Sequence, residues 1–194
     1  MALKYSAIKI ELREIELNNM PQELLSISPN ATVPVLTIND ATVMDESWDI
    51  IKWAVSQNDP ENWSGKNNQY IIDTKKLIEI NDFSFKENLD HYKYADRFPE
   101  HSEIYYREAC EVFIAQLETM LSGKKFLLDD KLSLADIAVF PFVRQFSMVN
   151  IKHFEQSPFS NVRRWLDNHV HSKLFLKAFT KHAAWKTGDD IVYL

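Results

Sequence analysis

The hydrophobic pattern of the chain changes near residues 58–66, and this change limits the fold more than any other feature. Before it, short runs of apolar and β-branched residues stand between short helical patterns. After it, apolar residues recur at helical spacing to the end of the chain. Strands followed by a run of helices predict an α/β region joined to an all-helical region. We therefore expect two domains, residues 1–58 and residues 66–194, joined by a linker.

Local patterns predict the regular elements within these two regions. The expected order in the first region is a strand at 8–17, a helix at 21–26, a strand at 33–38, a tight turn at 39–40, a strand at 41–44 and a helix at 46–55. In the second region, apolar stripes predict helices at 71–92, 105–120, 134–149, 159–170 and 173–179.

Composition and charge exclude several classes of function. The chain has 22 basic and 28 acidic residues, and its formal net charge of −6 disfavours a nucleic-acid partner. No apolar run approaches the roughly 18 residues of a membrane span, so no membrane partner is expected. Cys110 is the only cysteine, which excludes an internal disulfide and favours a cytoplasmic location. The three glycines are too scattered to form a phosphate-binding loop.

A helix that begins at Glu46–Ser47 offers a binding site for an anion. The first N–H groups of a helix have no partner within the helix, and they carry the positive end of its dipole. The Ser47 hydroxyl would add a further donor. Ordinary capping also explains this sequence, with Asp45 or Ser47 as the N-cap residue. Both interpretations hold together.

Ser133 and Asp136 have the spacing of a capping box at the start of the apolar helix expected at 134–149. This is a structural role, and loss of Ser133 is expected to cost about 1 kcal/mol of stability. A metal site is not expected. His169 and His171 are two positions apart, so they face different sides of a helix and do not readily share a metal ion.

Two segments of the chain resemble signature segments of the glutathione transferase family, in the family's order. Ser28–Leu36, with the sequence SPNATVPVL, is similar to the signature loop of the N-terminal domain. Ser133–Ile137, with the sequence SLADI, is similar to the helix-capping signature, and residues 138–146 continue it in the style of bacterial members. The resemblance implies an incomplete thioredoxin-like, glutathione-binding domain followed by an all-helical C-terminal domain.

The resemblance also implies roles for residues of the first domain, with glutathione as the ligand and no metal. A cis Val33–Pro34 peptide bond would turn the Val33 N–H and C=O outward, where an extended tripeptide pairs with them. Spacing alone favours a plain strand start with a trans proline. Ser47 and the helix N-terminus would hold the γ-glutamyl carboxylate of glutathione, and Glu46 would face its ammonium group.

In the family, the second substrate binds in a cleft between the domains, near the helix pair that meets at Phe98–Pro99 in this chain. Tyr94, Arg97 and Tyr105 gather around this corner. We expect them to shape an apolar pocket for the second substrate. Ordinary surface aromatic and charged side chains are the alternative interpretation.

The family's first strand, catalytic loop and most of its first helix, about 20 residues, have no counterpart in this sequence. We therefore expect no catalytic residue in the chain, because Tyr5 and Ser6 match the far end of that helix. A start at an internal methionine and a genuine loss of the segment both explain this. Without the strand, the segments at 8–17 and 33–38 have unpaired edges. The domain is expected to close the gap, to exchange a segment with a partner chain, or to stay partly disordered.

The expected function is transfer of the glutathione thiol to an electrophile. A glutathione-dependent thiol–disulfide reductase and a non-catalytic binding protein of the same fold are the alternatives. Tyr or Ser in the catalytic loop would favour conjugation, Cys would favour reduction, and true absence would favour the binding protein. Asn30–Ala31 stands where many relatives have Lys-Gly, which weakens contact with the glycyl carboxylate. The expected partners are glutathione and a small electrophile or disulfide, and a homodimer is usual in the family.

Overall fold

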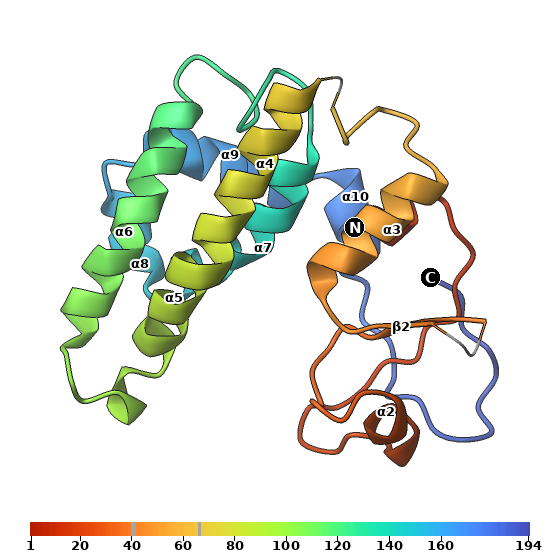
Figure 1. Ribbon diagram of the computed structural model, residues 1–194. Helices are drawn as coiled ribbons and strands as arrows, with labels where there is room; N and C mark the ends of the chain where they lie inside the picture. Colours follow the sequence, from red (N-terminus) through yellow and green to blue (C-terminus); the bar gives the residue numbers. More distant parts are fainter. Residues whose placement is uncertain (40–41, 66) are drawn as a thin grey trace. The chain divides into compact units, whose positions relative to one another are not determined.

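The computed structural model describes residues 1–39, 42–65 and 67–194, which pack into two compact units (Figure 1). The first unit contains Met1–Glu61 together with Lys173–Leu194, and the second contains Asn62–Ser172.

This division differs from the domain boundaries predicted from the sequence, which place all of 66–194 in the helical domain. The chain from Lys173 onward packs with the first unit, where its backbone hydrogen-bonds to the segment after α1. Hydrophobic periodicity detects the helix at 173–178 but contains no information about which unit that helix packs against.

The first unit combines a short hairpin with four helices in its described part. Its elements are α1 (Ala2–Tyr5), α2 (Gln22–Ile27), β1 (Leu36–Ile38), β2 (Thr42–Met44), α3 (Ser47–Gln57) and α10 (Lys173–Ala178). The strands β1 and β2 are antiparallel, with Leu36 opposite Met44. Helix α1 contacts both α3 and α10, and Ala54 and Phe175 are buried there.

The prediction of a strand at 8–17 is wrong. Among the described residues this segment makes two isolated antiparallel bridges, Glu11 with Tyr193 and Glu16 with Asn19. A strand forms a ladder only where a neighbour runs beside it, and within the described residues β1 and β2 pair only with each other. The predicted strand at 33–38 is shortened to β1 for the same reason.

The helix predicted at 46–55 and the strand predicted at 41–44 correspond to α3 and β2, with small shifts at their ends. The tight turn predicted at Asn39–Asp40 includes Asp40, which lies outside the described residues, as does Ala41 at the predicted start of the second strand.

The second unit is helical in its described part. Its elements are α4 (Asn68–Ile80), the π-helical turn η1 (Asn81–Phe85), α5 (Lys86–Lys93), the 3₁₀ turn η2 (Ala95–Arg97), α6 (Glu103–Met120), α7 (Leu134–Val149), α8 (Ile151–Gln156) and α9 (Ser160–Val170). The apolar pattern predicts no separate helix at α8. The all-helical domain after the linker is confirmed.

Helix α7 lies in the core of the second unit, as its apolar sequence predicts. Every residue from Leu134 to Phe140 is buried, and α7 contacts α4, α5, α8 and α9. Burial on all sides explains why the first half of this helix lacks the polar face that a surface helix shows. In the described part of the chain, no helix is both long and apolar enough to cross a membrane.

Candidate functional site

The Val33–Pro34 loop presents open backbone groups. The Val33–Pro34 peptide bond is cis, and the Val33 side chain is 44% exposed. A turn just before it is closed by the Ala31 N–H, which donates to the Ser28 carbonyl at 3.0 Å. No described residue hydrogen-bonds to the Val33 N–H or C=O. Val33 therefore offers one donor and one acceptor to a ligand, which is what an extended peptide requires.

The N-terminus of α3 is also open. Glu46 is the N-cap residue, with extended φ and ψ of −97° and 124°, and its side chain accepts no hydrogen bond from the first turn. The sequence alternatives of Asp45 or Ser47 as the N-cap residue are therefore wrong. Glu46 is exposed and Ser47 is half-buried. The first-turn N–H groups are left available to water or to an anion.

The hairpin brings these two segments to the same end of one ladder. Leu36 lies opposite Met44, so the chain enters β1 through Pro34 at the end where it leaves β2 toward Glu46. Pro34 and Glu46 each lie two residues beyond this pair, so the Val33 loop and the start of α3 lie at the same end of the hairpin. This end therefore carries the open groups of both Val33 and the α3 N-terminus.

The start of α7 contains the capping box that the sequence predicts. The Ser133 hydroxyl accepts from the Asp136 N–H at 3.4 Å, and the Asp136 carboxylate accepts from the Ser133 N–H at 3.1 Å and from its hydroxyl at 2.6 Å. Asp136 also accepts from the Leu127 N–H at 2.9 Å and the Trp165 indole at 2.8 Å. Burial raises the pKa of the Asp136 carboxyl, and these hydrogen bonds oppose that shift. This network is fully enclosed, so it supports the fold.

The side chains of Tyr94, Arg97 and Tyr105 lie around the corner between α5 and α6. The Arg97 guanidinium lies 4.8 Å from the centroid of the Tyr94 ring. The Tyr105 ring stacks on His101 with a centroid distance of 3.9 Å. Tyr94 and Tyr105 are 41% and 49% exposed. Both rings are accessible, and their role in binding a second substrate stays a prediction.

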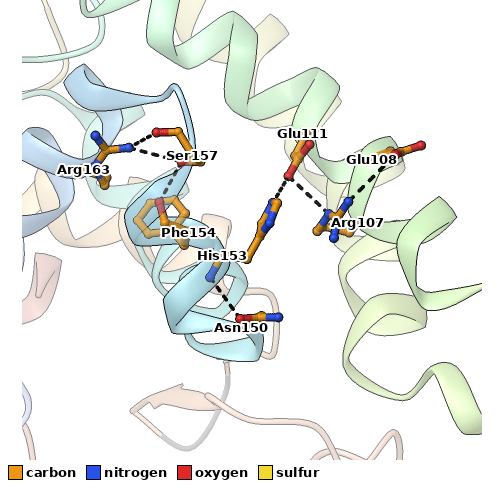
Figure 2. Close-up of polar contacts among 8 residues, drawn as sticks. All are labelled: Arg107, Glu108, Glu111, Asn150, His153, Phe154, Ser157 and Arg163. Carbon is orange, nitrogen blue, oxygen red and sulfur yellow. Dashed lines mark hydrogen bonds and ion pairs between the residues drawn. The ribbon is translucent and has the colours of Figure 1, made fainter.

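A cluster of polar side chains connects α6 to α8 (Figure 2). No sequence motif predicts this cluster. The Glu111 carboxylate lies 2.6 Å from His153 Nε2 and 3.4 Å from Arg107 Nε. Asn150 caps α8 by accepting from the His153 N–H at 3.0 Å. Because Glu111 and His153 are far apart in the sequence, spacing could not have revealed their contact. We interpret the cluster as a structural contact that stabilises the packing of α8 against α6.

The side chains that could act as a nucleophile or activate a thiol are hydrogen-bonded within the protein or buried. The Tyr5 hydroxyl donates to Asp59 at 2.7 Å and accepts from the Glu61 N–H at 2.7 Å, and burial raises the pKa of this phenol. Ser6 is buried. Burial raises the pKa of the Cys110 thiol to about 12, which makes it a poor nucleophile. No group of three potential metal ligands occurs among the described residues.

Comparison with known families identifies the class of protein that this fold defines. The model of the glutathione S-transferase N-terminal domain matches residues 1–63, and the model of the glutathione S-transferase C-terminal domain matches residues 105–168. The chain belongs to the glutathione S-transferase family.

Solved structures share the fold at low sequence identity. BphK, a bacterial glutathione S-transferase, is 19% identical with a TM-score of 0.77, over 91% of this chain and 89% of that one. Glutathione S-transferase 1-6 from Anopheles dirus species B is 19% identical with a TM-score of 0.75, over 91% and 87%. A family member from Pseudomonas fluorescens is 17% identical with a TM-score of 0.74, over 91% and 84%. These likenesses confirm a thioredoxin-like domain followed by a helical domain.

Proposed function

We propose that the chain binds glutathione at the end of the β1–β2 hairpin and delivers its thiol to a small electrophile. The observation that carries this proposal is the pair of open backbone sites there, at Val33 and at the N-terminus of α3. Relatives support the choice of ligand: the Pseudomonas fluorescens structure has two glutathione molecules bound, and one from Burkholderia graminis has two per subunit.

Three polar parts of the tripeptide have a counterpart at this site: its backbone, its γ-glutamyl carboxylate and its ammonium group. The middle residue of glutathione pairs with the N–H and C=O of Val33, and Pro34 keeps that segment extended. The γ-glutamyl carboxylate lies against the Ser47 hydroxyl and the first N–H groups of α3, which favour an anion. Glu46 faces the ammonium group. We assign glutathione as the substrate and no metal.

In the reaction, the glutathione thiol loses its proton and the thiolate sulfur attacks an electrophilic carbon. A carbon–sulfur bond forms, and the leaving group departs with its bonding electron pair. We assign no residue among 1–194 to activation of the thiol, because Tyr5 is held by Asp59 and Cys110 is buried. These residues also disfavour a reductase that uses Cys110. A thiol–disulfide reductase with a cysteine in the family's catalytic loop and a non-catalytic glutathione-binding protein are the alternatives.

Calorimetric titration with glutathione tests the site. We expect Ser47→Ala and Glu46→Ala each to weaken binding about tenfold, since each removes a hydrogen bond or a charge contact to a charged group. Asp49→Asn is the matched control: Asp49 lies in the same helical turn but pairs with Lys52 at 2.6 Å. Unchanged affinity in both site variants would exclude this site. Turnover of an aryl chloride then separates the two functions, because a binding protein takes up glutathione without forming the thioether.

We further propose that Tyr94, Arg97 and Tyr105 contact the second substrate. Their exposed rings and guanidinium offer an apolar face with one cation beside it. Tyr105→Ala should raise KM for the electrophile several-fold while leaving KM for glutathione unchanged. Equal changes in both constants would argue against this assignment.

A further inference from the structure

Among the residues that the structure describes, the segment after α1 has one backbone partner that is distant in sequence, residues 185–194. The Leu12 N–H donates to the Val192 carbonyl at 2.7 Å, the Leu194 N–H to the Ile10 carbonyl at 2.9 Å, and the Trp185 N–H to the Glu14 carbonyl at 2.8 Å. These bonds place Glu11 opposite Tyr193 in an antiparallel bridge. We call residues 185–194 the strap and residues 9–14 the acceptor edge.

Side chains add specific anchors to this pairing. The Lys9 ammonium lies 4.0 Å from the centroid of the Tyr193 ring, and the Arg13 guanidinium lies 4.5 Å from that of Trp185. The Thr187 hydroxyl donates to the Glu23 carboxylate at 2.8 Å. The acceptor edge and α2 therefore recognise two aromatic rings and one hydroxyl at set positions along an extended segment.

The strap is held at its backbone more than by burial. Ile191, Val192 and Tyr193 are 58%, 44% and 49% exposed, so the strap removes little apolar surface from water. The residues that lead to it, Lys181–Ala184, make no backbone hydrogen bond to any described residue. A segment detaches locally at low free-energy cost when it has few buried contacts and when the residues that connect it make no backbone hydrogen bonds. Opening uncovers the acceptor edge.

We propose that the acceptor edge also binds the strap of a second copy of this chain, so that two chains exchange their straps. A second copy is the partner that fits best, because it carries both rings and the hydroxyl at the required spacing. The contacts in the exchanged form are the same as those within one chain. The conformation of the connecting residues 181–184 and the protein concentration therefore decide whether the exchanged or the unexchanged form is more populated. This inference does not depend on glutathione binding.

A disulfide placed across the bridge tests the exchange. In Glu11→Cys/Tyr193→Cys, the two thiols occupy a pair flanked by, but not joined by, hydrogen bonds, where Cα atoms are about 4.5 Å apart. Native Cys110 is buried and needs no replacement. Nitrogen-15-labelled and unlabelled protein are mixed without denaturant at increasing concentration, oxidised and digested. Mass spectrometry then identifies the linked peptides, and Tyr193→Cys alone measures disulfides formed by random collision.

Linked peptides with one labelled and one unlabelled half, increasing with concentration, are the expected result. Linked peptides with matching labels at every concentration would mean that each strap stays on its own chain, and absence of the link would mean that the bridge does not form; either result overturns the proposal. Amide hydrogen exchange of the unsubstituted chain gives an independent check. The Leu12 amide should be protected, and Trp185→Ala should accelerate its exchange several-fold; an unprotected Leu12 amide contradicts the pairing.

Discussion

Helices α7 and α3 each begin with a serine close to an acidic residue, but the two helix starts are opposite in structure. At α7, Ser133 and Asp136 cap each other, and Asp136 also accepts from Leu127 and Trp165. At α3, Glu46 is the N-cap residue and caps nothing with its side chain. At α7, the serine and aspartate side chains form hydrogen bonds within the protein, so they stabilise the fold. At α3, the first backbone N–H groups have no such partner in the side chain of the N-cap residue, and free donors are what a binding site for an anion needs.

The largest effect on stability is expected where the network is closed. Asp136→Ala should lower the free energy of unfolding by about 3 kcal/mol or more, because it leaves buried donors of Ser133, Leu127 and Trp165 without an acceptor. Urea unfolding followed by circular dichroism measures this. Asp90→Ala is the control, since Asp90 is exposed and its ion pair with Lys93 should contribute little. Similar losses in both variants would contradict the role of the network.

A second test concerns a polar group that the helical unit buries without a complete set of partners. His169 lies 4.9 Å from Phe140 and 4.8 Å from Trp165 between ring centroids, and its Nε2 has no hydrogen-bond partner among the described residues. Burial lowers the pKa of His169 to about 4, from 6.5. Between pH 4 and pH 6.5 the unfolded chain therefore binds more protons than the folded chain does.

Stability should thus fall as the pH is lowered from 6.5 toward 4, by on the order of 3 kcal/mol from this group. His169→Phe keeps a ring at this position and removes the titration. The loss of unfolding free energy between pH 7 and pH 4.5 should be smaller in this variant than in the unsubstituted chain. Equal losses would show that other groups cause the acid sensitivity.

A smaller effect is expected from removing the cap alone. Ser133→Ala should cost about 1 kcal/mol, because Asp136 keeps its other donors while the first turn of α7 loses one acceptor. The shift of the urea midpoint measures it. A change as large as that of Asp136→Ala would mean that the two residues act as one unit.

The smallest effect on stability is expected at the open helix start. Ser47→Ala should change the free energy of unfolding by less than about 0.5 kcal/mol, because the Ser47 hydroxyl caps nothing. The same variant should lose glutathione affinity in calorimetry. A marked loss of stability would remove the contrast with α7 and would support a structural role for Ser47.

Local features of the fold could be predicted from sequence. The Ser133–Asp136 box depends on two residues three positions apart, and the helical unit depends on periodicity, so both follow from short windows. The sequence also predicts a helix start at α3, but it places the N-cap residue at Asp45 or Ser47, one position away from Glu46. Capping depends on a backbone angle that composition does not determine.

Long-range pairing could not be predicted in the same way. The segment at 8–17 has the alternation of a strand, yet its main partner is the strap, which lies at the other end of the chain. The contact of Glu111 with His153 likewise joins two helices whose packing no local pattern specifies. Such contacts depend on which helices and strands pack against each other in the tertiary structure, and a single sequence contains that information only indirectly.

The burial of Cys110 has a practical consequence for chemical labelling of this protein. A thiol with a pKa of about 12 and no exposed surface should react slowly with maleimides and iodoacetamide while the helical unit stays folded. One cysteine introduced on the surface would then be the single reactive position on the native protein. A fluorophore or spin label could be attached at a chosen residue without first removing the natural thiol.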